Sequence, residues 1–245
     1  MRLVLDVENT ITKRDDKVHL DPFEPTNHLV QVGMLDADDP KPTLTIKTLD
    51  HNESKDDTGF NRLDIQWTLD NTKLLIMHNA QHDLMWLWEC GFRYDGAIYD
   101  TMLAEYILDR GQRNGLSLQA CAERRQLEVQ KDDTLKKYFK EGKNTNEIPL
   151  AELCHYLEHD LLTTCELFHA QERDFSMPEA KSLSTIKRVT FQTCKTLTEI
   201  YSAGFKVDLQ ELERVAKEFE NEKAEIETRL QKKVREVMGD TPINL

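Results

Sequence analysis

The sequence predicts an α/β domain with a mixed central sheet flanked by helices, followed by a C-terminal helical extension. Short apolar runs typical of buried strands come early in the chain, and strands and helices alternate after residue 74. Beyond residue 177 the pattern is helical. We therefore expect one domain over residues 1–177 and an extension over residues 178–245.

Three strands are expected to open the domain as an antiparallel meander. They cover residues 3–6, 29–35 and 43–48. Residues 10–27 contain charges and two prolines and are expected to form an irregular excursion, and the acidic residues 49–59 a loop. Two further short strands are expected at residues 74–77 and 97–99.

Helices are expected where apolar residues recur at helical spacing, over residues 81–89, 101–108, 116–127, 183–202 and 209–237. Residues 60–69 fit either a helix or a return toward the sheet, and residues 131–146 a polar surface excursion. Pro149 is expected to open a long amphipathic helix, and Asp208 to cap the last one. The last helix has an apolar stripe that is more typical of a packing surface than of a ligand site.

Composition excludes several classes of protein. The net charge of −13 argues against strong independent binding to duplex DNA, because phosphates favour Lys and Arg. It favours binding to a short single-stranded segment of nucleic acid, or a partner protein that supplies the basic surface. No run approaches the ~18 apolar residues of a membrane span, so no membrane partner is expected. The N-terminus does not resemble a signal peptide, which favours the cytoplasm. Five scattered cysteines indicate reduced thiols.

Four carboxylates stand in three short motifs, each beside an expected strand or helix. Asp6 and Glu8 end the first strand two residues apart, so their side chains share one face. Asp83 lies in the first turn of a helix that follows a buried strand, and Asp160 lies inside the long helix. Hard divalent cations prefer oxygen ligands, and two ions in one site require carboxylates from several elements. The motifs therefore predict a divalent metal site.

Each motif also has a purely structural explanation. An acidic pair after a strand can simply begin a loop. Asp83 can favour the helix dipole, and Asn79 can be a turn residue. Tyr156 lies one turn before Asp160, where it can pack or can orient a water molecule beside a metal ligand. All three motifs in order, each on the expected element, favour the metal site over these alternatives.

In these motifs the chain resembles the DnaQ-like, or DEDD, 3′→5′ exonucleases, in the subclass with tyrosine in the third motif. The resemblance covers residues 1–175 and implies a ribonuclease H-like fold with two Mg²⁺ or Mn²⁺ ions. It implies that the metal ligands are Asp6, Glu8, Asp83 and Asp160. Tyr156 would orient the attacking water, and the substrate contacts would come from Asn79, Asn9 and Thr10. Asn9 stands where the family often has threonine.

Two further segments resemble the proofreading domains of family A DNA polymerases. Residues 99–108 resemble the segment between the second and third motifs, in which Asp100 starts a helix that supports the site. Residues 197–209 resemble the stretch that leads to the polymerase thumb. Polymerase motifs are absent from the chain. The resemblance implies an exonuclease of phage type whose polymerase domain is separate or removed, and the last helix is where that domain should dock.

The expected function is metal-dependent removal of nucleoside 5′-monophosphates from a single-stranded or frayed DNA 3′ end. RNase D-like proteins share these carboxylates and act on RNA, so an RNA substrate is one alternative. A catalytically silent module of a split DNA polymerase is the other. The four histidines nearest the motifs are expected to be bystanders, namely His78, His82, His155 and His159.

Overall fold

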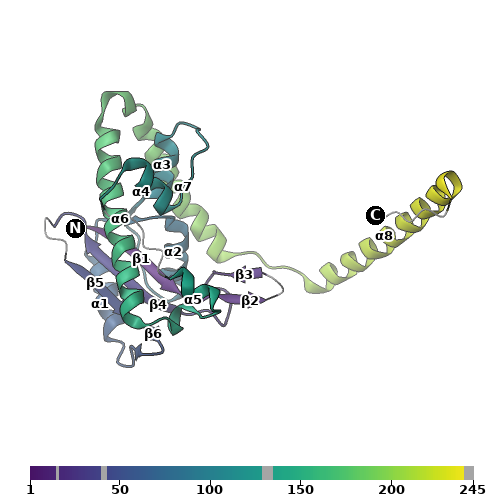
Figure 1. Ribbon diagram of the computed structural model, residues 1–245, viewed down its shortest axis with the longest axis horizontal. Coiled ribbons are helices and arrows are strands. Elements are labelled where there is room, and N and C mark those ends of the chain that lie inside the picture. The colour runs from purple at the N-terminus through teal and green to yellow at the C-terminus, as the bar shows by residue number, and fades with distance from the viewer. Residues whose placement is uncertain (15–16, 40–42, 129–134, 240–245) are drawn as a thin grey trace. The chain divides into compact units, whose positions relative to one another are not determined.

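The computed structural model describes residues 1–245 except 15–16, 40–42, 129–134 and 240–245. It confirms the α/β class, with a mixed five-stranded sheet of order β5-β4-β1-β8-β9 (Figure 1). The strands are β1 (Arg2–Asn9), β4 (Leu29–Asp36), β5 (Leu44–Thr48), β8 (Leu74–Met77) and β9 (Ala97–Asp100). β1 pairs antiparallel with β4 and parallel with β8. The first three of these strands form the expected meander.

Two small hairpins lie where only loops were expected. In the excursion after β1, β2 (Thr12–Arg14) pairs with β3 (Lys17–His19). In the acidic loop, β6 (Asp50–His51) pairs with β7 (Ser54–Lys55). Strands of two or three residues are too short to show the alternation of polar and apolar residues by which a strand is recognised in sequence. The loop interpretation of these segments was therefore wrong in detail.

The helices are α1 (Phe60–Asp70), α2 (Ala80–Glu89), α3 (Thr101–Leu108), α4 (Leu118–Arg125), α5 (Lys136–Lys140), α6 (Leu150–Ser176), α7 (Leu183–Ala203) and α8 (Leu209–Met238), with 3-10 turns η1 (Thr145–Glu147) and η2 (Pro178–Ala180). Residues 60–69, which the sequence left open, are helical. The polar excursion before Pro149 contains α5 and η1. Pro149 itself is the N-cap of α6.

Helix α6 packs across the sheet, and a glycine sets how closely it approaches. Helix α6 runs across the strands in Figure 1. Its residues Leu157 and Leu161 are fully buried. A Cβ atom on Gly33 of β4 would lie 2.6 Å from Leu161 Cδ1 and 2.9 Å from Leu157 Cγ. Gly33 is the register partner of Asp6 on β1. The close approach therefore brings α6 down onto the sheet beside the first acidic motif.

The chain divides into two compact units, residues 1–202 and 203–245. This division falls later than the expected boundary at residue 177, because α7 packs on the first unit. Phe191 of α7 is buried, and its ring centroid lies 4.9 Å from that of Tyr99. Lys195 Nζ donates a hydrogen bond to the Gly96 carbonyl oxygen at 3.3 Å.

The second unit consists of α8, and none of the residues of this helix is buried. Asp208 caps it by accepting hydrogen bonds from the backbone N–H groups of Gln210 and Glu211. The apolar stripe is exposed along its length, with Phe219 66% exposed. Among the described residues, no helix has the length and apolar character needed to cross a membrane.

Candidate active site

The first acidic motif lies at the carboxyl end of β1, in the middle of the sheet. Asp6 and Glu8 are half-buried and pair in register with Gly33 and Gln31 of β4. Residues two apart on a strand project from the same face, so the two carboxylates lie side by side. The apolar residues that alternate with them are buried. The strand thus presents both acids from a rigid, central position.

Asp83 lies in the first turn of α2 and is only 2% exposed. Its Oδ2 atom is buried and has no hydrogen-bond partner among the described residues. Burial is the main cause that raises the pKa of Asp83 well above the ordinary value, followed by the charges of Asp6 and Asp100. A hydrogen bond from the Val7 backbone lowers this pKa in part. A buried carboxylate beside other carboxylates is the environment that a cation would relieve.

Asp100 ties the start of α2 to the start of α3. Its carboxylate accepts hydrogen bonds from the backbone N–H groups of Met102 and Leu103, at 2.9 and 3.1 Å, and so caps α3. It also accepts from Asn79 and Ala80, at 3.3 and 2.9 Å. One buried side chain therefore fixes the helix that carries Asp83 against the end of β9. Asp100 therefore starts α3, as the family resemblance implied, and its support of the site stays a prediction.

Tyr156 and Asp160 project from one face of α6, one turn apart, and they complete the cluster. Asp160 is 5% exposed and Tyr156 is half-buried. Burial raises the pKa of the Tyr156 phenol most, followed by the charges of Asp160, Glu8 and Asp6 and a hydrogen bond with Asp160. The phenol therefore keeps its proton and acts as a hydrogen-bond donor. Because the charges of Glu8 and Asp6 act on the Tyr156 phenol, the third motif lies near the first.

The donor set fits a hard divalent cation, although the carboxylates do not form a closed ligand shell. In the described part of the chain, no three His, Cys, Asp or Glu side chains converge closely enough to hold a metal ion. The charges of Asp6 and Glu8 nevertheless reach Asp83, whose pKa burial raises most and these charges raise further. The orphaned oxygen of Asp83 and the all-oxygen character of the cluster suit Mg²⁺ or Mn²⁺.

Two of the three expected substrate contacts have buried side chains. Asn9 Nδ2 donates to the carbonyl oxygens of Thr10 and Leu20, at 2.8 and 3.3 Å. Thr10 is 2% exposed, and its Oγ1 accepts a hydrogen bond from the His28 backbone N–H at 2.6 Å. In this structure both residues hold the end of β1 in place. Asn79 is exposed at the start of α2 and has a positive φ of 70°.

The histidines near the motifs have structural surroundings. His82 Nε2 lies 3.0 Å from Asn9 Oδ1, and burial lowers the pKa of His82. The nitrogens of His78 lie 2.9 Å from Thr101 Oγ1 and 3.0 Å from the Leu116 carbonyl oxygen. His155 and His159 of α6 contact each other edge to face, with ring centroids 4.5 Å apart.

Sequence reasoning missed the role of Gly33, which lets α6 approach the acidic strand. The available signal was a glycine inside an otherwise apolar strand run, which often marks a close approach of another element. It also missed the Asn9–His82 contact, which joins β1 to α2 across 73 residues of sequence. No local pattern in the sequence indicates that contact.

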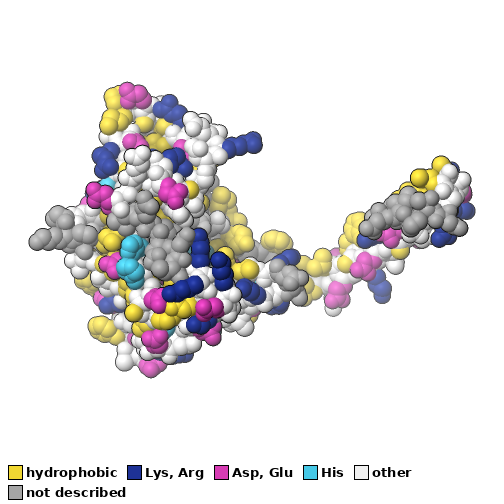
Figure 2. Space-filling model, viewed as in Figure 1, with side chains coloured by type: hydrophobic (Ala, Val, Ile, Leu, Met, Phe, Trp, Pro, Cys, Tyr) yellow, Lys and Arg dark blue, Asp and Glu magenta, His cyan; other side chains and the backbone are white. Residues whose placement is uncertain are grey.

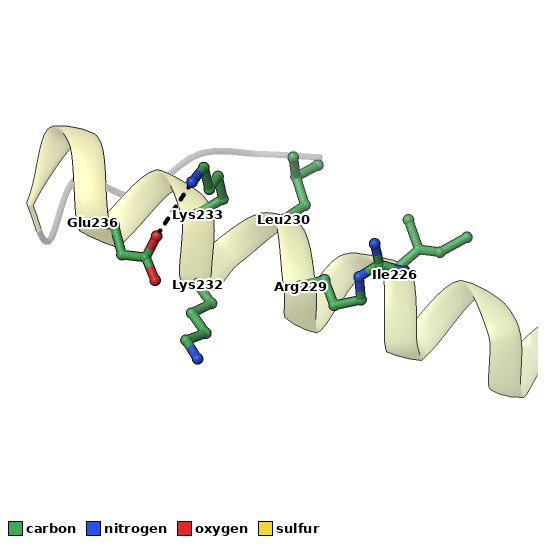
Figure 3. Close-up of a pocket in the computed structure, with 6 residues that line it drawn as sticks. All are labelled: Ile226, Arg229, Leu230, Lys232, Lys233 and Glu236. Atoms are coloured by element: carbon green, nitrogen blue, oxygen red, sulfur yellow. Dashed lines mark ion pairs between the residues drawn. The ribbon is translucent and has the colours of Figure 1, made fainter.

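A hollow along α8 offers no comparable chemistry. Figure 3 shows six side chains around it, Ile226, Arg229, Leu230, Lys232, Lys233 and Glu236. Its one carboxylate, Glu236, is paired with Lys233 at 3.6 Å. The cluster of acids on β1, α2 and α6 is therefore the candidate active site.

Comparisons with known proteins agree with this assignment. A family model described as 3′-5′ exonuclease matches residues 49–174, just over half of the chain. The match includes the second and third motifs. It does not reach Asp6 and Glu8, which the structure brings to the same place. No curated protein matches the chain.

Solved nuclease structures share the fold. One, described as the apo form of a nuclease, is 16% identical with a TM-score of 0.59, covering 84% of this chain and 87% of that chain. Brucella melitensis NrnC with bound Mg²⁺ is 18% identical with a TM-score of 0.56, covering 84% of this chain and 88% of that one. A second structure of Brucella melitensis NrnC, described without Mg²⁺, is also 18% identical. It has a TM-score of 0.55 and covers 84% of this chain and 88% of that chain.

Proposed function

The chain belongs to the 3′-5′ exonuclease family, and we propose that it removes nucleoside 5′-monophosphates one at a time from DNA 3′ ends. The observation that carries the proposal is that, in addition to burial, the charges of Asp6 and Glu8 on β1 raise the pKa of both Asp83 on α2 and Tyr156 on α6, so the three motifs lie near one another. The mutual repulsion of these carboxylates destabilises the folded chain, so fold stability does not explain why they lie together. A reaction at a phosphodiester next to divalent cations accounts for it.

In the proposed mechanism, Asp6, Glu8, Asp83 and Asp160 would hold two Mg²⁺ or Mn²⁺ ions. When bound, such ions supply an activated water and stabilise the departing oxygen. The Tyr156 phenol, whose O–H is held by the Asp160 carboxylate, would accept a hydrogen bond from the water and so orient it toward the terminal phosphorus. Water adds to phosphorus, the bond to the 3′-oxygen breaks, and that oxygen takes up a proton. The products are a nucleoside 5′-monophosphate and a strand one nucleotide shorter.

The metal requirement is supported by the chemistry of the donor set and by a relative. Asp83 has a buried oxygen without a described partner and a raised pKa, which a divalent cation would correct. Brucella melitensis NrnC, which shares the fold, was solved with bound Mg²⁺. The number of two ions rests on the resemblance to DEDD exonucleases and on the count of four carboxylates.

A DNA substrate and a proofreading role rest on the polymerase-like segments at residues 99–108 and 197–209. The carboxylate cluster itself suits any phosphodiester, so RNA is the alternative substrate. A single-stranded or frayed end suits both, because the scissile phosphate must leave the duplex to reach carboxylates that are half or fully buried.

The test uses 5′-labelled single-stranded DNA and RNA of the same sequence, with Mg²⁺, with EDTA, and with the Asp6→Asn variant. A ladder of DNA shortened from the 3′ end, abolished by EDTA and by Asp6→Asn, is the expected result. Preferential shortening of RNA would keep the chemistry and replace the substrate. Failure to shorten either strand would favour the catalytically silent module.

A polymerase domain remains the proposed partner, and α8 is its proposed docking element. Within the second unit the apolar side chains of α8 are uncovered, and Figure 3 draws two of them, Ile226 and Leu230. Their exposed fractions are 52% and 43%. An amphipathic helix with an uncovered apolar face typically packs against another element. Charged substitution of Phe219 should abolish association with such a domain without lowering the thermal stability of the free chain, because the side chain is exposed.

A further inference from the structure

Within the first unit of this acidic protein, one stretch is rich in positive charge. The segment that contains α5, residues 135–143, carries four lysines and one acidic residue, in a chain of net charge −13. The β2–β3 hairpin adds Lys13, Arg14 and Lys17. Figure 2 shows Lys and Arg side chains gathered over α5 and this hairpin. We call the two segments together the basic surface.

The two segments are joined although they lie far apart in the sequence. The Ile11 backbone N–H donates to Asn144 Oδ1 at 2.9 Å, and Asn144 Nδ2 donates to the Ile11 carbonyl oxygen at 2.8 Å. This pair of hydrogen bonds spans 133 residues of sequence. It connects the base of the hairpin directly to the end of the lysine-rich segment, so the lysines of both segments belong to one surface.

The basic surface adjoins the carboxylate cluster on two sides. The hairpin continues directly from β1, which carries Asp6 and Glu8. On the other side, Leu135 and Tyr138 of the α5 segment pack in one small apolar cluster, and Tyr156 packs against that cluster. Tyr138 also donates a hydrogen bond to Glu152 of α6 at 2.6 Å. A strand held on these lysines would therefore have its end next to the acids.

Three lysines of the surface carry charge that no described residue neutralises. Lys13, Lys17 and Lys140 are exposed and make no ion pair with the described part of the chain. Asp15 and Asp16 lie between the first two in sequence but outside the described residues. Other charges of the surface have acidic partners, as in Arg14–Glu24 at 3.0 Å and Lys137–Glu152 at 3.0 Å.

We propose that the basic surface binds the phosphates of a single-stranded nucleic acid upstream of its 3′ end. The inference rests on the proposed function, which places the last nucleotide at the carboxylates. An acidic protein repels a polyanion, and its catalytic acids repel it further, so binding requires a local positive field. Exposed lysines supply that field and release counterions from the strand when they bind. The basic surface thus raises the affinity of the enzyme for strands longer than one or two nucleotides.

The test compares a triple variant of these lysines with a matched control in the full chain. The variant is Lys13→Gln, Lys17→Gln and Lys140→Gln. The control is Lys206→Gln, Lys217→Gln and Lys232→Gln, three exposed lysines of the second unit that likewise make no ion pair with described residues. Both sets change the net charge equally. Anisotropy of a fluorescent 12-nucleotide DNA strand in EDTA then measures binding without turnover.

We expect the dissociation constant of the variant to rise about tenfold at 0.1 M salt, with little change in the control. The slope of log affinity against log salt should fall in magnitude by about 2, since each phosphate contact on a single strand contributes roughly 0.7. An affinity and a salt slope equal to those of the unaltered chain would overturn the proposal. An equal loss in the control would overturn it as well, because it would reflect net charge alone.

Turnover separates this inference from the proposed function. The p-nitrophenyl ester of thymidine 5′-monophosphate has one nucleotide and cannot reach the upstream lysines. The ratio of kcat/KM for the 12-nucleotide strand to that for the ester should fall about tenfold in the variant. Equal losses on both substrates would contradict a role confined to upstream phosphates. Absence of Mg²⁺-dependent turnover by the unaltered chain would defeat the proposed function, while the binding comparison would still decide the inference.

Discussion

Replacing Gly33 with alanine tests whether the close approach of α6 to the sheet builds the site. The new Cβ would lie 2.6 Å from Leu161 Cδ1, and 2.9 and 3.1 Å from two atoms of Leu157. Carbon atoms in contact prefer about 3.5–4.0 Å, so the shortfall is roughly 1 Å. Leu161 and Leu157 are fully buried, so neither side chain can change rotamer without disturbing other core residues. We therefore expect the helix to move.

Two effects of Gly33→Ala follow, one on stability and one on activity. Overpacking of a core typically costs about 1–3 kcal/mol, and reduced freedom of the unfolded chain returns roughly 0.4–1 kcal/mol. A net loss of about 1–2 kcal/mol would lower the Tm by roughly 2–8 °C in a chain of this size. Tyr156 and Asp160 neighbour the two leucines on α6, and a displacement of about 1 Å at a catalytic group can cost ~100-fold in rate.

The assay combines thermal unfolding with the initial rate of Mg²⁺-dependent shortening of a labelled strand. Leu161→Ala alone should destabilise the chain by creating a cavity. Combined with Gly33→Ala, it should cost less than the sum of the two changes, because it removes the nearest clashing atom. A Gly33→Ala variant with the rate and Tm of the unaltered chain would refute the idea that this contact positions α6.

Three further predictions concern single side chains of the site. Asp100→Ala leaves four backbone N–H groups at the starts of α2 and α3 without their hydrogen-bond acceptor. It should lower the free energy of unfolding by about 2–4 kcal/mol in denaturant unfolding. A loss below roughly 0.5 kcal/mol would argue against the role of Asp100 in holding the two helices. Tyr156→Phe should lower kcat about 100-fold with KM little changed, because it removes only the hydroxyl that would orient the water; a rise in KM alone would make Tyr156 a binding residue. Since the folded chain raises the pKa of Asp83, stability without metal should fall as pH rises above about 4, the unfolded value. Mn²⁺ should therefore raise the Tm more at pH 8 than at pH 5, and Asp83→Asn should raise the Tm in EDTA and reduce the metal effect; equal metal effects at both pH values would contradict this linkage.

The sequence predicts those parts of the fold that depend on local pattern. The apolar run before Asp6 and the helical spacing after Pro149 place the first and third motifs on the elements that the structure assigns. Asp100 is the N-cap of α3: its backbone is extended and its carboxylate accepts hydrogen bonds from the first N–H groups of the helix. An aspartate directly before a run of helix-forming residues is a local signal for such a cap. Where each signal lies within a few residues of its element, the expectation is accurate.

Features that depend on contacts between distant segments could not be predicted in this way. The family resemblance implied a substrate contact for Asn9, and local sequence provided no sign of its contacts with the Leu20 carbonyl oxygen and with His82. The boundary at residue 177 followed a change in local pattern, whereas Phe191 ties α7 to the first unit through tertiary packing. The β2–β3 hairpin is held by Asn144 from the other end of the domain. Each of these three features depends on which distant segments lie side by side in the folded chain.

The central claim is that four carboxylates on three elements form one metal-dependent exonuclease site. It is tested most directly by comparing Asp160→Asn with Glu158→Gln, an exposed neighbour on the same helix, in the shortening of 5′-labelled single-stranded DNA with Mg²⁺. The account predicts that Asp160→Asn abolishes the ladder while Glu158→Gln leaves it unchanged, and that EDTA abolishes it in every case. A ladder that survives Asp160→Asn or EDTA would contradict the assignment of the site.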